Sequence, residues 1–247
     1  MLKLGTLART SRARSRRVNL ASLPEARVTE ITASLRERNK ADKRHRIRKA
    51  ARALFVKHGY DNTTMREIAK RADIGFGTIF TYASDKRDLL FLIYNDELDK
   101  IVDTALKNAS TKRIFLEQLF AYFRTFYVFF LPQPELSRVV LREMTFYMKG
   151  RQAKQFQAST VRMIQHLACL VEAAQAAQAI ATREDPQFIA QALISTFAQA
   201  LRRWIAIDDE PKLSEGLARL RRLLVLQISG FEPRESALGR SYPTDRV

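Results

Sequence analysis

The sequence is poor in residues that cross-link a chain or turn it tightly. Its only cysteine, Cys169, excludes an intrachain disulfide and fits a reducing compartment such as the cytoplasm. Glycine and proline number 8 and 7 among 247 residues, which disfavours a β-rich fold and favours helices. The three histidines, His45, His58 and His166, are scattered, and His166 with Cys169 supplies too few ligands for a metal ion. We therefore expect no metal site.

Long apolar runs and catalytic motifs are absent as well. The aromatic run from Phe115 to Leu131 is shorter than the about 20 apolar residues that span a bilayer. Glu117 and Arg124 also interrupt this run. The sequence has no nucleophile elbow, no phosphate-binding glycine loop and no metal-spaced His/Cys set. We expect neither a membrane protein nor an enzyme, with no catalytic residue and no cofactor.

Positive charge is what the sequence has in excess. The formal net charge is +17. Residues 1–90 hold 22 Lys/Arg and 9 Asp/Glu, a net charge of +13, whereas residues 91–247 hold 21 and 17, a net charge of +4. A basic segment beside a near-neutral one indicates a surface that binds a polyanion, although a solvated basic face has the same composition.

The first 20 residues carry six of these basic side chains and no acidic one. We expect this segment to be a mobile arm that follows phosphates or enters an adjacent minor groove. An inert tail, a mitochondrial transit peptide and a membrane-surface segment are the alternatives.

Helical spacing of apolar residues predicts an all-α fold. Apolar residues recur on one face between Ile47 and Phe55, and Gly59 suits the left-handed end of that helix. Thr64 and Glu67 have capping-box spacing for a short second helix, and Ser84-Asp85 caps a longer fourth one. The other predicted helices span about residues 76–82, 111–131, 135–149, 151–180, 186–207 and 213–229.

The first block of helices has the plan of a helix-turn-helix. Two short helices follow a longer supporting helix, and the second of them can enter the major groove of DNA. The ordered motifs in this block are Ile47-x-x-Ala50-Ala51-x-x-Leu54-Phe55-x-x-x-Gly59-Tyr60, Thr63-Thr64-Met65-x-x-Ile68-Ala69, Gly77-Thr78-Ile79-Phe80-x-Tyr82 and Lys86-x-x-Leu89-Leu90. In these motifs the sequence strongly resembles the TetR family of transcriptional regulators.

Four positions depart from the residues usual in that family. Asp73 stands where glycine is usual, but aspartate tolerates the left-handed conformation. Gly75 replaces serine or threonine and is still an acceptable N-cap. Phe80 lacks the hydroxyl of the usual tyrosine, and Ala83 is smaller than the usual phenylalanine. We expect the turn and the short helix to survive these changes.

The resemblance implies a set of DNA contacts on the two short helices and on the start of the next. Phe76 can meet a thymine methyl group, and Gly77 allows close backbone approach. Thr78 and Tyr82 offer hydroxyls to phosphate, with helix capping and core packing as their alternative roles. The implied DNA-binding residues are Arg66, Phe76, Gly77, Thr78, Thr81, Tyr82 and Lys86, and the small core is assigned to Ile47, Leu54, Ile68 and Ile79.

The predicted helix 111–131 is apolar nearly all round and should be buried. In the family that the sequence resembles, this region encloses a small-molecule pocket, and an apolar lining with a few polar groups suits such a site. Plain core packing is the alternative for each residue. The candidate ligand-binding residues are Phe123, Tyr127, Met144, Tyr147, His166 and Trp204.

Two apolar stripes near the C-terminus suggest a dimer face, since two helices from each subunit would form a four-helix interface. Either stripe is alternatively part of the intrachain core. The stripes are Ile189, Leu193, Phe197, Leu201 and Trp204 on one helix and Leu213, Leu217, Leu220, Leu224 and Ile228 on the other.

These observations predict a chain of four parts. They are a partly disordered basic extension (1–40), a helix-turn-helix domain (41–88), a helical ligand-binding and dimerisation domain (89–230) and a C-terminal tail (231–247). We expect a homodimeric regulator of double-stranded DNA, a repressor that a small apolar or amphipathic effector releases from a palindromic operator. A ligand-independent regulator or an activator of the same fold is the alternative.

Overall fold

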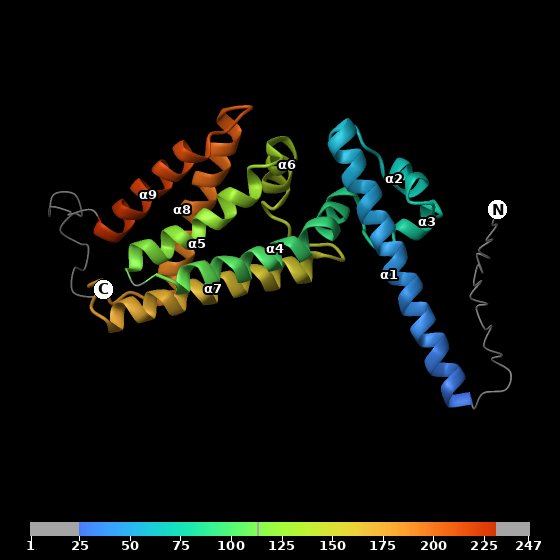
Figure 1. Ribbon diagram of the computed structural model, residues 1–247, viewed down its shortest axis with the longest axis horizontal. Helices are drawn as coiled ribbons and strands as arrows, with labels where there is room; N and C mark the ends of the chain where they lie inside the picture. Colours follow the sequence, from blue (N-terminus) through green and yellow to red (C-terminus); the bar gives the residue numbers. More distant parts are fainter. Residues whose placement is uncertain (1–24, 113, 231–247) are drawn as a thin grey trace, which may run out of the picture. The chain divides into compact units, whose positions relative to one another are not determined.

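The computed structural model describes residues 25–112 and 114–230, with side chains from residue 32 onward in these ranges. Every regular element of this part is a helix, as the spacing predicted (Figure 1). The predicted basic arm at 1–20 and the tail at 231–247 lie outside the described residues. The helices are α1 Glu25–His58, α2 Met65–Arg71, α3 Phe76–Ile79, α4 Lys86–Ser110, α5 Phe115–Phe130, α6 Pro134–Glu143, α7 Ala153–Ala176, α8 Pro186–Ile207 and α9 Leu213–Ser229.

The chain divides into two compact units between Lys43 and Arg44, within α1. In the first unit the side chains from Ala33 to Lys43 are exposed. The second unit begins at Arg44 and contains the rest of α1 with all other helices. No helix of the described ranges has both the length and the apolar character needed to cross a bilayer.

Local signals in the sequence set the ends of the short helices. The predicted capping box is present: the Thr64 hydroxyl accepts the Glu67 N–H, and the Glu67 carboxylate accepts the Thr64 N–H at 2.8 Å. Asp73 adopts the left-handed conformation with φ of 53°, and Gly59 does so with φ of 78°. The Asp85 carboxylate caps α4 by accepting the N–H three residues later. These four predictions are confirmed.

A hydrophobic core joins the helix-turn-helix to the C-terminal helices. Ile47, Ile68 and Ile79 are fully buried, and Leu54 is 8% exposed, so the predicted small core is confirmed. Leu89 and Leu90 at the start of α4 belong to the same core, which extends through α5, α7 and α8 to α9. Helix α4 packs on both α5 and α7, and Figure 1 shows α4 and α7 lying side by side.

The two apolar stripes on α8 and α9 face the inside of the chain. Leu193, Phe197, Leu201 and Trp204 are at most 7% exposed, and Leu220 and Leu224 are 1% exposed. The intrachain alternative is therefore the correct one for these residues. The side chains that α8 and α9 leave in solvent are different ones, among them Phe188, Val225 and Leu226.

The segment between α6 and α7 differs from its prediction as helix. Helix α6 ends at Glu143, whereas the apolar spacing predicted a helix to about residue 149. The chain leaves the helical conformation at Phe146, with φ of 58°, and at Gly150, with φ of 136°. This path lets the Tyr147 hydroxyl reach the Asp88 carboxylate, and such a long-range contact leaves no mark in local spacing.

Candidate nucleic-acid interface and ligand pocket

The outer surface of α2 and α3 combines an arginine with an exposed aromatic ring. The Phe76 side chain is 42% exposed at the first residue of α3, and the Arg66 side chain is exposed on α2. The Arg66 guanidinium lies 5.2 Å from the centre of the Phe76 ring, and Phe80 meets the same ring edge-on at 5.2 Å. Two of the predicted DNA-contact residues are thus brought together on one exposed surface, where the arginine keeps donors for phosphate or base edges.

The remaining predicted contacts of α3 lie beside this ring. Gly77 and Thr81 are exposed, whereas Thr78 is half-buried. The helix starts at Gly75 without a side-chain cap, so Thr78 does not fill the alternative capping role. The Thr81 hydroxyl donates to the Thr78 carbonyl at 2.8 Å, which leaves its oxygen lone pairs for another donor. Contact of these residues with DNA stays a prediction.

Gly77 offers a test in which stability and DNA binding change in opposite directions. A Cβ atom added there would meet nothing within 4 Å, and the residue does not have a positive φ. Gly77→Ala should therefore raise the free energy of unfolding by about 0.5–1 kcal/mol, because glycine is costly inside helices. If the backbone approaches DNA here, affinity for the operator should fall at the same time. Urea denaturation and fluorescence anisotropy measure the two effects, and unchanged affinity would contradict the close approach.

Lys86 has structural contacts that its sequence position did not reveal. Its ammonium group donates to the Tyr60 carbonyl at 2.9 Å and to the Asp61 carbonyl at 3.1 Å. It also lies 4.6 Å from the centre of the Tyr60 ring. One of its three N–H donors remains for a phosphate. Lys86 therefore ties the start of α4 to the turn between α1 and α2, whether or not it also contacts DNA.

Lys86→Ala should lower the free energy of unfolding by about 1 kcal/mol, because two hydrogen bonds to carbonyls are lost. If one phosphate contact goes as well, binding to all duplexes should weaken alike, and the salt slope should drop by about 0.9. Lys100→Ala, on the exposed surface of α4, is the matched control and should change neither quantity. A loss of stability with unchanged affinity and slope would make Lys86 a purely structural lysine.

Two side chains just before α7 donate hydrogen bonds to the backbone that follows α3. The Arg151 guanidinium donates to the Phe80 carbonyl at 2.8 Å, and the Gln152 side-chain amide donates to the Tyr82 carbonyl at 2.9 Å. Tyr82 itself is half-buried and packs against the core. The backbone that follows α3 is therefore fixed by residues about 70 positions later in the chain.

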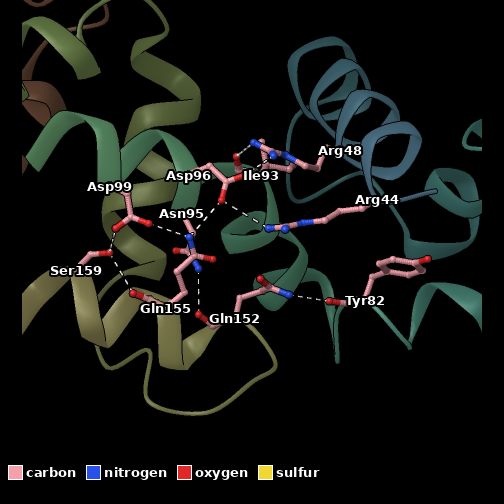
Figure 2. A network of polar contacts seen from close by, with 10 residues as sticks. All are labelled: Arg44, Arg48, Tyr82, Ile93, Asn95, Asp96, Asp99, Gln152, Gln155 and Ser159. Carbon is pink, nitrogen blue, oxygen red and sulfur yellow. Dashed lines mark hydrogen bonds and ion pairs between the residues drawn. The ribbon is translucent and has the colours of Figure 1, made fainter. Parts of the chain in front are cut away.

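A polar network extends these contacts along α4 and α7, as Figure 2 shows. Arg48 of α1 pairs with Asp96 and donates to the Ile93 carbonyl at 3.0 Å. The Gln155 amide donates to Asp96 at 3.2 Å and to Asp99 at 2.8 Å. Burial acts to raise the pKa of Asp96, but the hydrogen bond from Gln155 and the charge of Arg48 outweigh it and lower the pKa. The network ties α1, α4 and α7 together.

Asp88 is the most buried acidic group of the described residues, with no exposed surface. One carboxylate oxygen accepts the Tyr147 hydroxyl and the Gln152 N–H, the latter at 2.8 Å. The other accepts the Ser84 N–H at 2.7 Å and the Arg151 N–H at 2.9 Å. Burial favours the neutral acid, yet these four hydrogen bonds to the charged form lower the pKa of Asp88 below its ordinary value.

Gly150 makes room for this carboxylate. A Cβ atom at Gly150 would lie 2.6 Å from the nearer oxygen of Asp88. Gly150 also has a φ of 136°, a conformation that residues with a side chain rarely adopt. Neither Asp88 nor Gly150 is predicted from the sequence as a functional residue. An acidic residue inside the apolar start of α4 was the only available signal.

An apolar cavity of about 130 Å³ lies among α4, α5, α6, α7 and α8. Of the six predicted ligand-binding residues, Met144 alone lines it. The lining was missed because its members come from five helices at positions that only tertiary packing brings together. It includes Leu98, Val102, Phe126, Phe130, Phe156 and Phe197.

The other five candidates have other neighbours. Phe123 stacks on Phe197 at 4.4 Å between ring centres, and Tyr127 packs on Trp204 at 4.8 Å. The Trp204 indole donates to the Lys212 carbonyl at 3.0 Å. The remaining two are Tyr147, which binds Asp88, and His166, which is half-buried on α7. Their role as ligand contacts stays a prediction, and no group of three or more His, Cys, Asp and Glu in the described ranges is placed to hold a metal ion.

Comparison of sequences finds relatives of the helix-turn-helix. The family profile described as "Bacterial regulatory proteins, tetR family" matches residues 47–93. The HTH-type transcriptional regulator HbdR of Aromatoleum sp. (strain CIB) is 43% identical over 58 residues, which are 24% of this chain and 25% of HbdR. The chain thus matches about a quarter of the length of that curated relative.

Comparison of structures extends the likeness to the C-terminal helices. A FadR regulator from Bacillus subtilis in complex with stearoyl-CoA has a TM-score of 0.61 and 19% identity, over 76% of this chain and 99% of that one. The TetR-family repressor FadR of Thermus thermophilus, in complex with lauroyl-CoA, has a TM-score of 0.59 and 22% identity, over 77% and 97%. At these identities the likeness shows a shared fold. Residues 47–93 therefore match the tetR family of bacterial regulatory proteins in sequence, and the chain as a whole shares the all-helical fold of these two FadR regulators.

Proposed function

We propose that this chain is a sequence-specific, DNA-binding transcriptional regulator that represses genes until a small ligand releases it from its operator. The observation that carries the proposal is the exposed surface of Arg66, Phe76 and Gly77 on a helix-turn-helix with a buried core. In this proposal residues 41–88 bind DNA, whereas residues 89–230 bind the effector and a second subunit. The excess positive charge of residues 1–90 supports contact with phosphates.

The effector site in this proposal is the apolar cavity. Its volume of about 130 Å³ is below the ~300–1,000 Å³ typical of ligand sites, so a larger ligand must displace part of the wall. Leu141 and Met144 form part of that wall at the end of α6, and the segment after them is anchored on Asp88. A ligand that moves this segment binds one placement of α3 more tightly than another. Regulation by a ligand requires such a difference in affinity between two states of the protein. The acyl-CoA ligands of the two FadR structures support an acyl chain as effector.

The operator is best sought without assumptions about its sequence. The full chain is used to select bound duplexes from a random pool, and the enriched DNA is sequenced. We expect two related half-sites in near-palindromic order, because one recognition helix reads only a few base pairs. A pool with no enriched sequence after repeated rounds would contradict sequence-specific binding.

A homodimer is part of the same proposal, with an interface on the solvent-exposed sides of α8 and α9. Val225 is 43% and Leu226 is 47% exposed on α9, so apolar contacts are available there. Sedimentation velocity at micromolar concentration should show a dimer, and Leu226→Arg should shift it towards monomer because a charge would be buried. Wild-type protein that sediments only as monomer, with and without DNA, would contradict the dimer.

A further inference from the structure

The apolar cavity has a basic neighbour on the protein surface. A depression between α6 and α8 is lined by Arg138, Arg142 and Arg202, together with Phe146 and apolar side chains. Leu141 and Arg202 line both this depression and the cavity, so the two spaces meet at these side chains. An apolar interior therefore adjoins a positively charged surface site, which we name the arginine mouth.

The three arginines of the mouth are not equivalent. Arg138 is held by the Ile205 carbonyl at 2.7 Å and by Asp209 at 3.7 Å. Arg142 pairs with Asp61 at 3.1 Å and with Glu143 at 3.0 Å. Both guanidinium groups are thus engaged by the protein itself.

Arg202 has no hydrogen bond and no ion pair within the described ranges, although its side chain is half-buried. None of its guanidinium nitrogens is both buried and unpartnered, so they stay accessible from outside, and an anion can bind them through charge-assisted hydrogen bonds without displacing a protein partner. Arg202 is therefore the side chain of the mouth that is free to bind a ligand.

Phe146 adds an apolar surface to the same mouth. Its ring is 87% exposed, and its backbone has φ of 58°, which is uncommon for a residue other than glycine. The core gains nothing from a ring in this position. A ligand that extends from the cavity across the mouth would cover the Phe146 ring. Removing this apolar surface from water would contribute favourably to the free energy of binding.

We propose that the arginine mouth binds the anionic head group of an amphipathic ligand whose apolar chain enters the cavity, and that Arg202 recognises the charge. The inference rests on the proposed function, since it takes the cavity as the effector site. It narrows the effector to a molecule with an aliphatic chain next to a carboxylate or phosphate. A neutral chain of the same length fills the cavity without using Arg202.

Three ten-carbon probes separate chain from charge: decanoate, decanoyl-CoA and 1-decanol. Their affinities for the full chain are measured by calorimetry with wild-type protein, with Arg202→Gln and with Arg203→Gln. Arg203 is exposed on the same helix and lines neither space, so it is the matched control.

We expect Arg202→Gln to weaken binding of at least one anionic probe by tenfold or more, because a charge-assisted hydrogen bond is lost. If only decanoate binds more weakly to Arg202→Gln, Arg202 binds the carboxylate of the ligand. If only decanoyl-CoA binds more weakly, Arg202 binds the phosphates. Binding of 1-decanol should not change, and Arg203→Gln should leave all three affinities as they are.

Two results would overturn the inference while the cavity remains the effector site. Equal loss for 1-decanol would mean that Arg202 only supports the wall, and unchanged affinity for both anions would place the head group elsewhere. Wild-type protein that binds none of the probes also overturns it. Failure of the proposed function is seen separately, as the absence of a selected operator in the DNA pool experiment, which uses no ligand.

Discussion

Asp88→Asn should lower the free energy of unfolding by about 3 kcal/mol, because it disrupts a fully buried carboxylate that accepts four hydrogen bonds. Each carboxylate oxygen of Asp88 accepts two hydrogen bonds, and at least one in each pair comes from a backbone N–H. In the asparagine variant, an amide nitrogen replaces one of the two carboxylate oxygens. At least one backbone N–H then faces that nitrogen and has no acceptor. The buried donor then loses its partner without regaining water.

Urea denaturation measures this loss, and two variants isolate its cause. Asp103→Asn makes the same chemical change at an exposed position of α4 and should cost under about 1 kcal/mol. Tyr147→Phe removes one of the four hydrogen bonds but keeps the ring, which stacks on Phe91 at 3.8 Å, and should cost about 1 kcal/mol. A cost for Asp88→Asn as small as that of Asp103→Asn would contradict the role of this carboxylate.

The pH dependence gives an independent check on Asp88. Because its pKa is lower in the folded protein than the ordinary value of 3.8, its ionised form is bound more favourably in the folded state. This contribution is present above pH 3.8 and is lost as the pH falls through the lower folded value. Asp88→Asn should therefore show a shallower decline of stability at acid pH than wild-type protein, as measured by urea denaturation at several pH values.

Much of the fold could be predicted because its signals are local. The capping box at Thr64, the left-handed residue Asp73 and the cap at Asp85 each depend on a few neighbouring residues, and each was predicted at the right position. The proline start of α8 after Asp185 is likewise a local signal, and that carboxylate accepts the Phe188 N–H at 3.1 Å.

The rest depends on residues far apart in the sequence. Apolar spacing shows that α8 and α9 each have a buried side, but not whether that side meets this chain or a second subunit. The helix predicted to 149 ends at Glu143, and the chain after it turns towards Asp88, about 60 residues earlier in the sequence. There the Tyr147 hydroxyl donates to the Asp88 carboxylate, and Gly150 leaves room for that carboxylate. The aromatic helix α5 was predicted to be buried, yet only Phe126 and Phe130 of its side chains line the cavity.

Filling the cavity should separate ligand response from DNA binding. Ala198 of α8 is half-buried and lines the cavity, so a leucine side chain there would occupy space that the effector needs. Three added carbon atoms displace about three methylene groups of the ligand, each worth about 0.8 kcal/mol when buried. Ala198→Leu should therefore raise the ligand concentration needed for release from the operator by about 50-fold. Ala158→Leu, on the exposed side of α7, makes the same change away from the cavity and should leave release unchanged.

The ligand-free properties of Ala198→Leu decide how its loss of response is interpreted. Its affinity for the selected operator should stay within about twofold of wild type, because the segment after α6 is displaced only when a ligand enters. Its free energy of unfolding should not fall by more than about 1 kcal/mol, since the new side chain enters empty space and does not crowd the core. If Ala198→Leu responds to ligand as wild type does, the effector binds outside this cavity. If it loses operator affinity without ligand, the added side chain itself moves the segment after α6, and the cavity then controls DNA binding through its volume alone.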